Sequence, residues 1–366
     1  MAKPTPRPGL TDIRPYTPGK AKSGGRKVYK LSANESALGA SPKAMAAYHA
    51  AMNSLERYPD GSSLELREMI EKVHGLPTDN LIIGAGSDDI ITLLIRAYAN
   101  EGDEILQTEY GFSYYAIAAK AALVGTSFAP ETAYCADIEK ILKTVGPKTK
   151  ILFLANPNNP TGTVLNATEI RNLRAELPPH ILLVLDGAYA EYMDDPNYTD
   201  GADLVAETIG SGADNMVMMR TFSKIYGLGG LRVGWAYAPT SIISILNRLR
   251  SPFNVSAPGL KAAVAAMEDQ DFVAQNRAHN AKERARIDMA LKGLGFQTIP
   301  SHGNFILFDA KSPDNAQTLL KTLEGDGVLI RSTASSNLPQ HLRVSIGDQP
   351  ANYAFLQSLT RAVQNA

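Results

Sequence analysis

Short apolar segments alternate with helical segments from residue 81 to about residue 220. The apolar segments are three to five residues long, are bounded by turn-forming residues, and lie at 81–83, 104–106, 151–154, 181–185 and 216–219. Helical periodicity fills most of the intervals, for example at 88–99 and 167–177. Short apolar strands that alternate with amphipathic helices are typical of a mostly parallel sheet covered on both faces. We therefore predict an α/β fold with a large, mostly parallel sheet.

The C-terminal part of the chain has a different character. Residues 232–238 add one more candidate strand, and the chain then becomes more helical and more charged. Three helical segments at 241–249, 258–267 and 271–294 precede two candidate strands at 304–308 and 341–346. This pattern favours a smaller α+β domain. We predict an N-terminal arm of residues 1–33 that packs with the small domain, a large domain of residues 34–245, and a small C-terminal domain of residues 246–366.

Composition narrows the class of ligand. The chain has 36 basic and 37 acidic residues, so it offers no basic surface for nucleic acid or for a membrane. It begins without the apolar stretch of a signal peptide, and no segment approaches the roughly 20 apolar residues of a membrane span. Cys135 is the only cysteine, and the six histidines show no metal-ligand spacing. We expect a cytoplasmic protein with a small-molecule substrate and no metal site.

Polar side chains gather where the apolar segments end, which is where open parallel sheets bind their ligands. Asp186 directly follows the segment 181–185. It fits either a helix N-cap or the counter-ion of a buried cationic ring. Asn159 lies in a loop after 151–154 that is first of all a turn, although its amide could also hold a ring oxygen.

Two further strand ends suit a phosphate group. Ser87 and Asp88 open a helix after a Gly-Ala-Gly turn, and the backbone N–H groups of a helix start bind anions. The alternative there is an N-capped helix without a ligand. After 216–219, hydroxyl groups, a lysine and an arginine share one glycine-rich loop. A lysine in such a desolvated loop can act as an amine nucleophile. The residues in question are Thr221, Ser223, Lys224 and Arg232.

Taken together, these motifs resemble the fold-type-I pyridoxal-phosphate aminotransferases. The resemblance is carried by Asn159-Pro-Thr-Gly, by Asp186-x-Ala-Tyr189, and by Ser223-Lys224 with Arg232 eight residues later. Within that class the chain is similar, nearly from end to end, to the histidinol-phosphate aminotransferase family. Additional matching segments begin at Ile13, Leu31, Arg57, Leu93, Tyr110, Gly303 and Leu342. The resemblance implies a seven-stranded large domain, a smaller α+β domain and an N-terminal arm.

The resemblance also implies roles for single residues toward pyridoxal 5'-phosphate. Lys224 would hold the cofactor covalently and transfer a proton during the reaction, and Asp186 would pair with the protonated pyridine nitrogen. Asn159 and Tyr189 would bind the phenolic oxygen of the ring, and Tyr110 would stack on the ring face. The phosphate would be bound by Ser87, Asp88, Thr221, Ser223 and Arg232, together with Tyr58 of the neighbouring subunit of a homodimer.

Substrate recognition is implied in the same way. Arg331 and Arg343 would meet the anionic end of the substrate, and Tyr16 and Asn34 would line its pocket. The expected reaction is transamination of L-histidinol phosphate with 2-oxoglutarate in histidine biosynthesis. The alternatives are an aromatic-amino-acid aminotransferase, a decarboxylase of a phosphorylated amino acid, and a non-catalytic cofactor-binding module. Gly187 and the pair Ser36-Ala37 depart from the family pattern, and this leaves the substrate more open than the cofactor.

Overall fold

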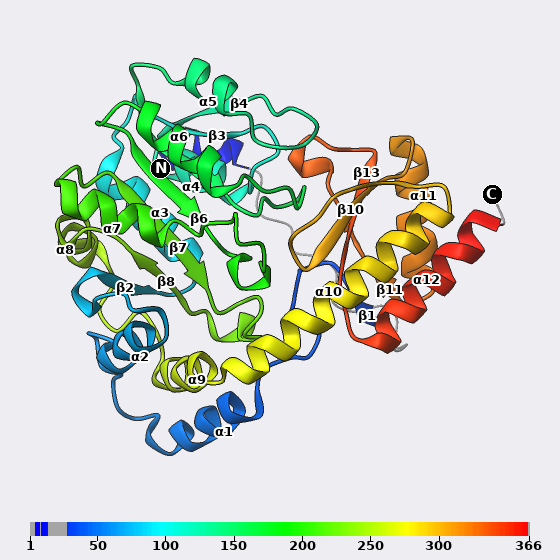
Figure 1. The fold of residues 1–366 in the computed structure, drawn as a ribbon, viewed down its shortest axis with the longest axis horizontal. Coiled ribbons are helices and arrows are strands. Elements are labelled where there is room, and N and C mark those ends of the chain that lie inside the picture. Colours follow the sequence, from blue (N-terminus) through cyan, green and yellow to red (C-terminus); the bar gives the residue numbers. More distant parts are fainter. Residues whose placement is uncertain (1–3, 8, 14–27, 365–366) are drawn as a thin grey trace.

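The computed structural model describes residues 4–7, 9–13 and 28–364, and its larger part is built on one seven-stranded sheet (Figure 1). The strand order is β2-β8-β7-β6-β5-β3-β4, and only β8 runs antiparallel to its neighbours. The strands are β2 (Leu81–Gly84), β3 (Glu104–Thr108), β4 (Gly125–Ala129), β5 (Thr149–Ala155), β6 (Leu182–Asp186), β7 (Met216–Thr221) and β8 (Gly234–Tyr237). The predicted α/β class with a mostly parallel sheet is confirmed.

Helices cover both faces of this sheet because its central strands are apolar on both sides. In β6, Leu182 and Val184 pack into one hydrophobic layer, whereas Leu183 and Leu185 pack into the other. The first layer contains α3 (Ser87–Tyr98), α4 (Tyr114–Ala121) and α8 (Thr240–Leu249). The second contains α1 (Pro42–Ala51), α2 (Leu64–His74), α5 (Ile138–Thr144), α6 (Ala167–Glu176), α7 (Ala202–Ser211) and α9 (Ala257–Glu268).

The smaller part is an α+β unit, as predicted. Its antiparallel sheet has the order β12-β13-β10-β9, formed by β9 (Gln297–Ile299), β10 (Phe305–Asp309), β12 (Arg331–Ser332) and β13 (His341–Ser345). Helices α10 (Gln270–Gly293), α11 (Pro313–Gly325) and α12 (Gln349–Gln364) supply apolar side chains to its core. No helix within the described ranges is long and apolar enough to cross a bilayer.

Helix α10 connects the two units (Figure 1). Near its beginning, Val273 packs into the core of the large sheet, whereas Ile287 and Leu291 pack into the core of the small domain. Helix α9 also belongs to the large core. The predicted boundary between residues 245 and 246 assigns these segments to the small domain. We propose instead that the domains divide within α10, because apolar burial defines a domain better than the rise in charge after residue 240.

The N-terminal arm is divided between the two units. Strand β1 (Tyr29–Lys30) pairs with β11 (Val328–Leu329) of the small domain. In contrast, the Arg7 guanidinium donates a hydrogen bond to the carbonyl of Ala121 at 2.9 Å, at the end of α4 in the large domain. The pairing of β1 agrees with the predicted packing of the arm with the small domain, whereas the Arg7 contact differs from it, and for the arm as a whole that packing stays a prediction.

Candidate active site

One cavity of about 410 Å³ lies at the carboxyl ends of β5, β6 and β7 and is closed on another side by the small domain. It brings together residues that are far apart in the chain. The predicted residues that line it are Asn34, Ser87, Asp88, Asn159, Asp186, Tyr189, Thr221, Ser223, Lys224, Arg232, Arg331 and Arg343. The sheet topology explains this convergence, because parallel strands end at the same edge.

Asp186 is the last residue of β6 and is buried at the cavity wall. One carboxylate oxygen accepts a hydrogen bond from the Tyr115 hydroxyl at 2.6 Å, and the other accepts one from the backbone N–H of Ala188 at 3.1 Å. Burial raises the pKa of Asp186 to about 6, although both hydrogen bonds act in the opposite direction. A buried carboxylate of this kind gains from a cationic partner, which a protonated pyridine nitrogen would supply.

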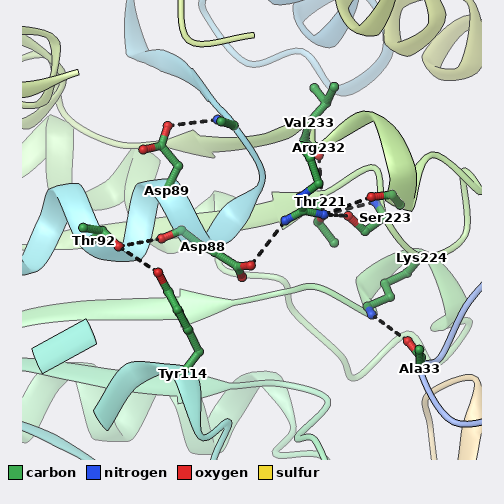
Figure 2. A network of polar contacts seen from close by, with 12 residues as sticks. Ala33, Asp88, Asp89, Thr92, Tyr114, Thr221, Ser223, Lys224, Arg232 and Val233 are labelled. Carbon is green, nitrogen blue, oxygen red and sulfur yellow. Dashed lines mark hydrogen bonds and ion pairs between the residues drawn. The ribbon is translucent and has the colours of Figure 1, made fainter. Parts of the chain in front are cut away.

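Lys224 extends from the loop after β7 into the cavity (Figure 2). Its Nζ donates a hydrogen bond to the carbonyl of Ala33 at 3.4 Å and lies 5.7 Å from the centre of the Tyr189 ring. The loop is held by Gly227, which has a φ of +71°. A Cβ there would lie 2.1 Å from the carbonyl oxygen of Gly39, so only glycine permits this close approach.

Beside Lys224, donors gather around the start of α3 (Figure 2). The Arg232 guanidinium donates to Ser223 Oγ at 3.3 Å and forms an ion pair with the Asp88 carboxylate at 3.2 Å. The first-turn backbone N–H groups of α3 begin at Ser87, and Gly86 precedes them without a side chain. Helix-start N–H groups, a hydroxyl and a guanidinium form a donor set that fits a phosphate.

The opposite wall of the cavity belongs to the small domain and carries two arginines. Arg331 on β12 and Arg343 on β13 are register partners, so their side chains emerge on the same face of the sheet. Arg343 is 8% exposed and donates hydrogen bonds to Asn159 Oδ1 and to the carbonyl of Ser32. Because Oδ1 accepts from Arg343, the amide nitrogen of Asn159 is the atom that can donate to a ligand.

Asn34 joins the two walls. Its Nδ2 donates to the Tyr189 hydroxyl at 2.9 Å, and its Oδ1 accepts from the Ser345 hydroxyl at 2.9 Å. The backbone of Asn34 has a φ of 54°, a conformation that asparagine tolerates better than most residues. Since the Tyr189 oxygen already accepts a hydrogen bond, its proton is available to donate to a cavity ligand.

Comparison with known proteins identifies a family that agrees with this arrangement of cavity residues. Residues 26–359 match the family described as aminotransferase class I and II. The chain belongs to the class I and II aminotransferases. It is 48% identical to the histidinol-phosphate aminotransferase of Nitrobacter winogradskyi, and the match covers 96% of each chain. It is 46% identical to the enzyme of that name from Granulibacter bethesdensis, over 95% of this chain and 93% of that one.

A solved structure supports the same family. Histidinol-phosphate aminotransferase from Sinorhizobium meliloti in complex with pyridoxal-5'-phosphate matches with a TM-score of 0.87 at 26% identity. The match covers 93% of this chain and 92% of that one. The family resemblance inferred from the sequence motifs is confirmed.

The structure places two predicted site residues of this aminotransferase outside the described lining of the cavity. The Tyr110 ring packs against Tyr134, with 5.8 Å between ring centres, while its backbone N–H donates to Glu131. Tyr58 is 83% exposed and stacks on Phe253, with ring centres 4.7 Å apart. Its predicted contact with a neighbouring subunit stays a prediction. Tyr16 lies outside the described residues.

Sequence reasoning missed other residues of the site. Phe112 lines the cavity two residues after Tyr110, and four hydroxyl-bearing residues of the segment 332–336 line it beside Arg331. Tyr115, which is fully buried behind the cavity, bonds to Asp186. Phe112 and the four hydroxyl-bearing residues lie close in the sequence to Tyr110 and Arg331, which the motifs had identified. Their nearness in the sequence to predicted site residues was therefore a signal that could have found them. Tyr115 lies in an apolar helical stretch that predicts a residue of the hydrophobic core, and no sequence pattern distinguishes it from other core residues.

Gly86 provides a first test of the proposed phosphate site. Its φ is +88°, and a Cβ would lie 2.4 Å from Nη2 of Arg232. We expect Gly86→Ala to displace the guanidinium and to raise the Kd for pyridoxal 5'-phosphate at least about tenfold. Fluorescence titration of the apoenzyme would measure this Kd. The matched control is Gly210→Ala in α7, where a Cβ meets nothing within 4 Å. Equal cofactor affinity in both variants would place the phosphate elsewhere.

Proposed function

We propose that this protein catalyses the pyridoxal-phosphate-dependent transamination of L-histidinol phosphate with 2-oxoglutarate, giving imidazole-acetol phosphate and glutamate, in histidine biosynthesis. One observation carries the proposal. A single cavity holds a lysine, a buried aspartate and a phosphate-type donor set on the large domain, and faces two arginines on the small domain. High identity to enzymes named histidinol-phosphate aminotransferase supports the choice of substrate. We further propose that it works in the cytoplasm, where a biosynthetic enzyme meets both substrates.

The residues of the cavity suit pyridoxal 5'-phosphate. Asp186 would pair with the ring nitrogen, and Asn159 and Tyr189 would donate hydrogen bonds to the ring oxygen. The donor set around Ser87 and Arg232 would bind the phosphate. When bound, this cofactor supplies an electron sink that stabilises negative charge on the substrate Cα. We also propose that Phe112, rather than Tyr110, faces the ring, because Phe112 lines the cavity and the Tyr110 ring is held against Tyr134.

Proton transfer falls to Lys224 in this proposal. Its Nζ is the amine of the loop that reaches the cavity, and the contact with the Ala33 carbonyl directs it toward the wall that carries Tyr189. The amine would accept a proton from the substrate Cα and deliver it to atom C4′ of the cofactor. The Asn34 bond to the Tyr189 hydroxyl orients that side chain beside the lysine. The arginines would hold the anionic end of the donor or of the 2-oxo acid.

A homodimer completes the proposal. Large apolar side chains are exposed along the segment from α1 to residue 58 and at Phe253. These exposed residues are Met45, Met52, Leu55, Tyr58 and Phe253. Tyr58 and Phe253 stack on each other, and exposed apolar surface of this kind favours a self-complementary interface. From it, Tyr58 would reach the phosphate of the other subunit. Sedimentation of the purified protein tests the assembly, and a monomer at micromolar concentration would contradict it.

The donor specificity is tested by a panel of amines with 2-oxoglutarate. We expect kcat/KM for L-histidinol phosphate to exceed that for phenylalanine, tyrosine and unphosphorylated histidinol by at least about a hundredfold. The reason is that the guanidinium groups of Arg331 and Arg343 would bind the phosphate ester, which the other amines lack. Glutamate formation is the readout. Preference for aromatic amino acids would favour the aromatic aminotransferase, and carbon dioxide release without glutamate would favour a decarboxylase. A protein that binds the cofactor but does not react with any amine would be a binding module.

A further inference from the structure

The Tyr115 hydroxyl is the closest polar contact of the Asp186 carboxylate. It donates to Oδ2 of Asp186 at 2.6 Å, from a side chain that is completely buried. Tyr115 does not line the cavity, so it does not touch a cavity ligand directly. Its ring is fixed on two sides: it stacks on Phe153 at 4.7 Å with an angle of 13° between the planes, and meets Phe112 edge-on at 5.5 Å.

Asp186 is poorly placed to remain charged without this donor. The carboxylate is fully buried, and Asp88 disfavours its charged form, whereas Lys224 favours it. Burial, together with neighbouring charges that include Asp186, raises the pKa of the Tyr198 hydroxyl, so this group also lies near the carboxylate. Hydrogen bonds that stabilise the anion come from only two described groups, the Tyr115 hydroxyl and the Ala188 backbone N–H. The Tyr115 bond is the shorter of the two.

Tyr115 is itself unable to act as an acid in this pair. Burial, together with the neighbouring charge of Asp186, raises the pKa of the Tyr115 hydroxyl well above its usual range. The proton therefore stays on the tyrosine and the negative charge stays on the aspartate. A hydroxyl that donates but never ionises stabilises a carboxylate throughout the neutral pH range.

We propose that Tyr115 is a positioning residue that keeps Asp186 ionised and correctly oriented for the cofactor's ring nitrogen. It acts through Asp186 and contacts neither the substrate nor the cofactor. The proposal rests on the proposed function only for the identity of the cofactor. It does not depend on which amine is the substrate, so a wrong donor assignment would leave it standing.

Tyr115→Phe is the appropriate variant, because phenylalanine preserves the stack on Phe153 and removes only the hydroxyl. We expect the affinity for pyridoxal 5'-phosphate, measured by fluorescence titration of the apoenzyme without any amine, to become more sensitive to acid. In the wild type the affinity should decrease when the pH is lowered below about 6, because Asp186 then becomes protonated. In the variant this fall should begin at least about one pH unit higher, with near-normal affinity restored at pH 8.5.

Two further variants make the test decisive. Tyr237→Phe removes the hydroxyl of another buried tyrosine, on β8, two strands away from β6. The Tyr237 side chain packs in the hydrophobic layer on the opposite face of the sheet from Tyr115, so this variant should keep the wild-type pH profile. Asp186→Asn should remove this pH dependence altogether. Thermal unfolding of each apoenzyme verifies that it is folded. An unchanged profile in Tyr115→Phe, or an equal loss of affinity at every pH, would overturn the proposal, because a merely structural tyrosine would produce one of these results.

Discussion

Lys224→Ala is expected to lower kcat for transamination by at least about a thousandfold while leaving the fold intact. The reason is that no other lysine lines the described cavity, so neither the covalent attachment nor the proton transfer has a substitute. The fold should survive because, within the described residues, the Lys224 amine makes a single long hydrogen bond of 3.4 Å, to the Ala33 carbonyl. Glutamate formation from 2-oxoglutarate measures kcat, and thermal unfolding of the apoenzyme measures stability.

A surface lysine provides the control for this variant. Lys261 forms an ion pair with Glu65, and both side chains are about half exposed. Lys261→Ala removes the same ammonium group from the chain but should keep kcat within about twofold, since exposed ion pairs contribute little. If Lys224→Ala retained more than a tenth of the wild-type kcat, the assignment of Lys224 as the catalytic amine would be wrong.

Asp186→Asn is expected to produce the second-largest effect, a loss of about a hundredfold or more in kcat. Asparagine has nearly the same shape but no charge, so it cannot stabilise a positive charge on the pyridine nitrogen. The electron sink would be weakened although the cofactor still fits. Steady-state kinetics with saturating cofactor measure the loss, and a variant with the wild-type kcat would show that the ring nitrogen is not the partner of Asp186.

The same variant has a predicted effect on the stability of the apoenzyme. Because burial raises the pKa of Asp186 to about 6, the folded protein binds more protons than the unfolded chain between about pH 4 and pH 6. The free energy of unfolding contributed by this group therefore falls as the pH rises through this range, by about 3 kcal/mol. Asp186→Asn should lack this decrease. Urea unfolding at pH 4.5 and pH 7 compares the two proteins, and identical pH slopes would contradict the assignment of the raised pKa.

Most of the large sheet was predictable because its strands carry their own signal. The segments at 151–154, 181–185 and 216–219 are buried on both faces, so burial forces an apolar run that is visible in the sequence. Strand β4 was not predicted. It lies at the edge of the sheet, and only Ala129 of its residues is buried, so its sequence contains no apolar run.

The sequence predicted Tyr110 in the cavity, whereas the structure places Phe112 there, because the local sequence lacks a signal for the direction of each ring. The motif places an aromatic residue near the end of β3, but it does not specify which aromatic ring turns inward. That is decided by the turn between β3 and α4, where the Tyr110 backbone is held by Glu131 and the chain reverses before Tyr114. As a result Phe112 lines the cavity while the Tyr110 ring packs on Tyr134, and the local sequence does not encode this choice.

The sequence by itself determined the fold class, the family and which polar residues of the large domain meet at the cavity, because each of those residues follows a strand whose apolar pattern marks its end. Only the tertiary structure decided how the small domain closes the cavity. The pairing of Arg331 with Arg343, the bond from Arg343 to Asn159 and the bond from Tyr115 to Asp186 join segments that are distant in the chain. Such contacts depend on how whole elements pack against each other, and a single sequence carries no local pattern for them.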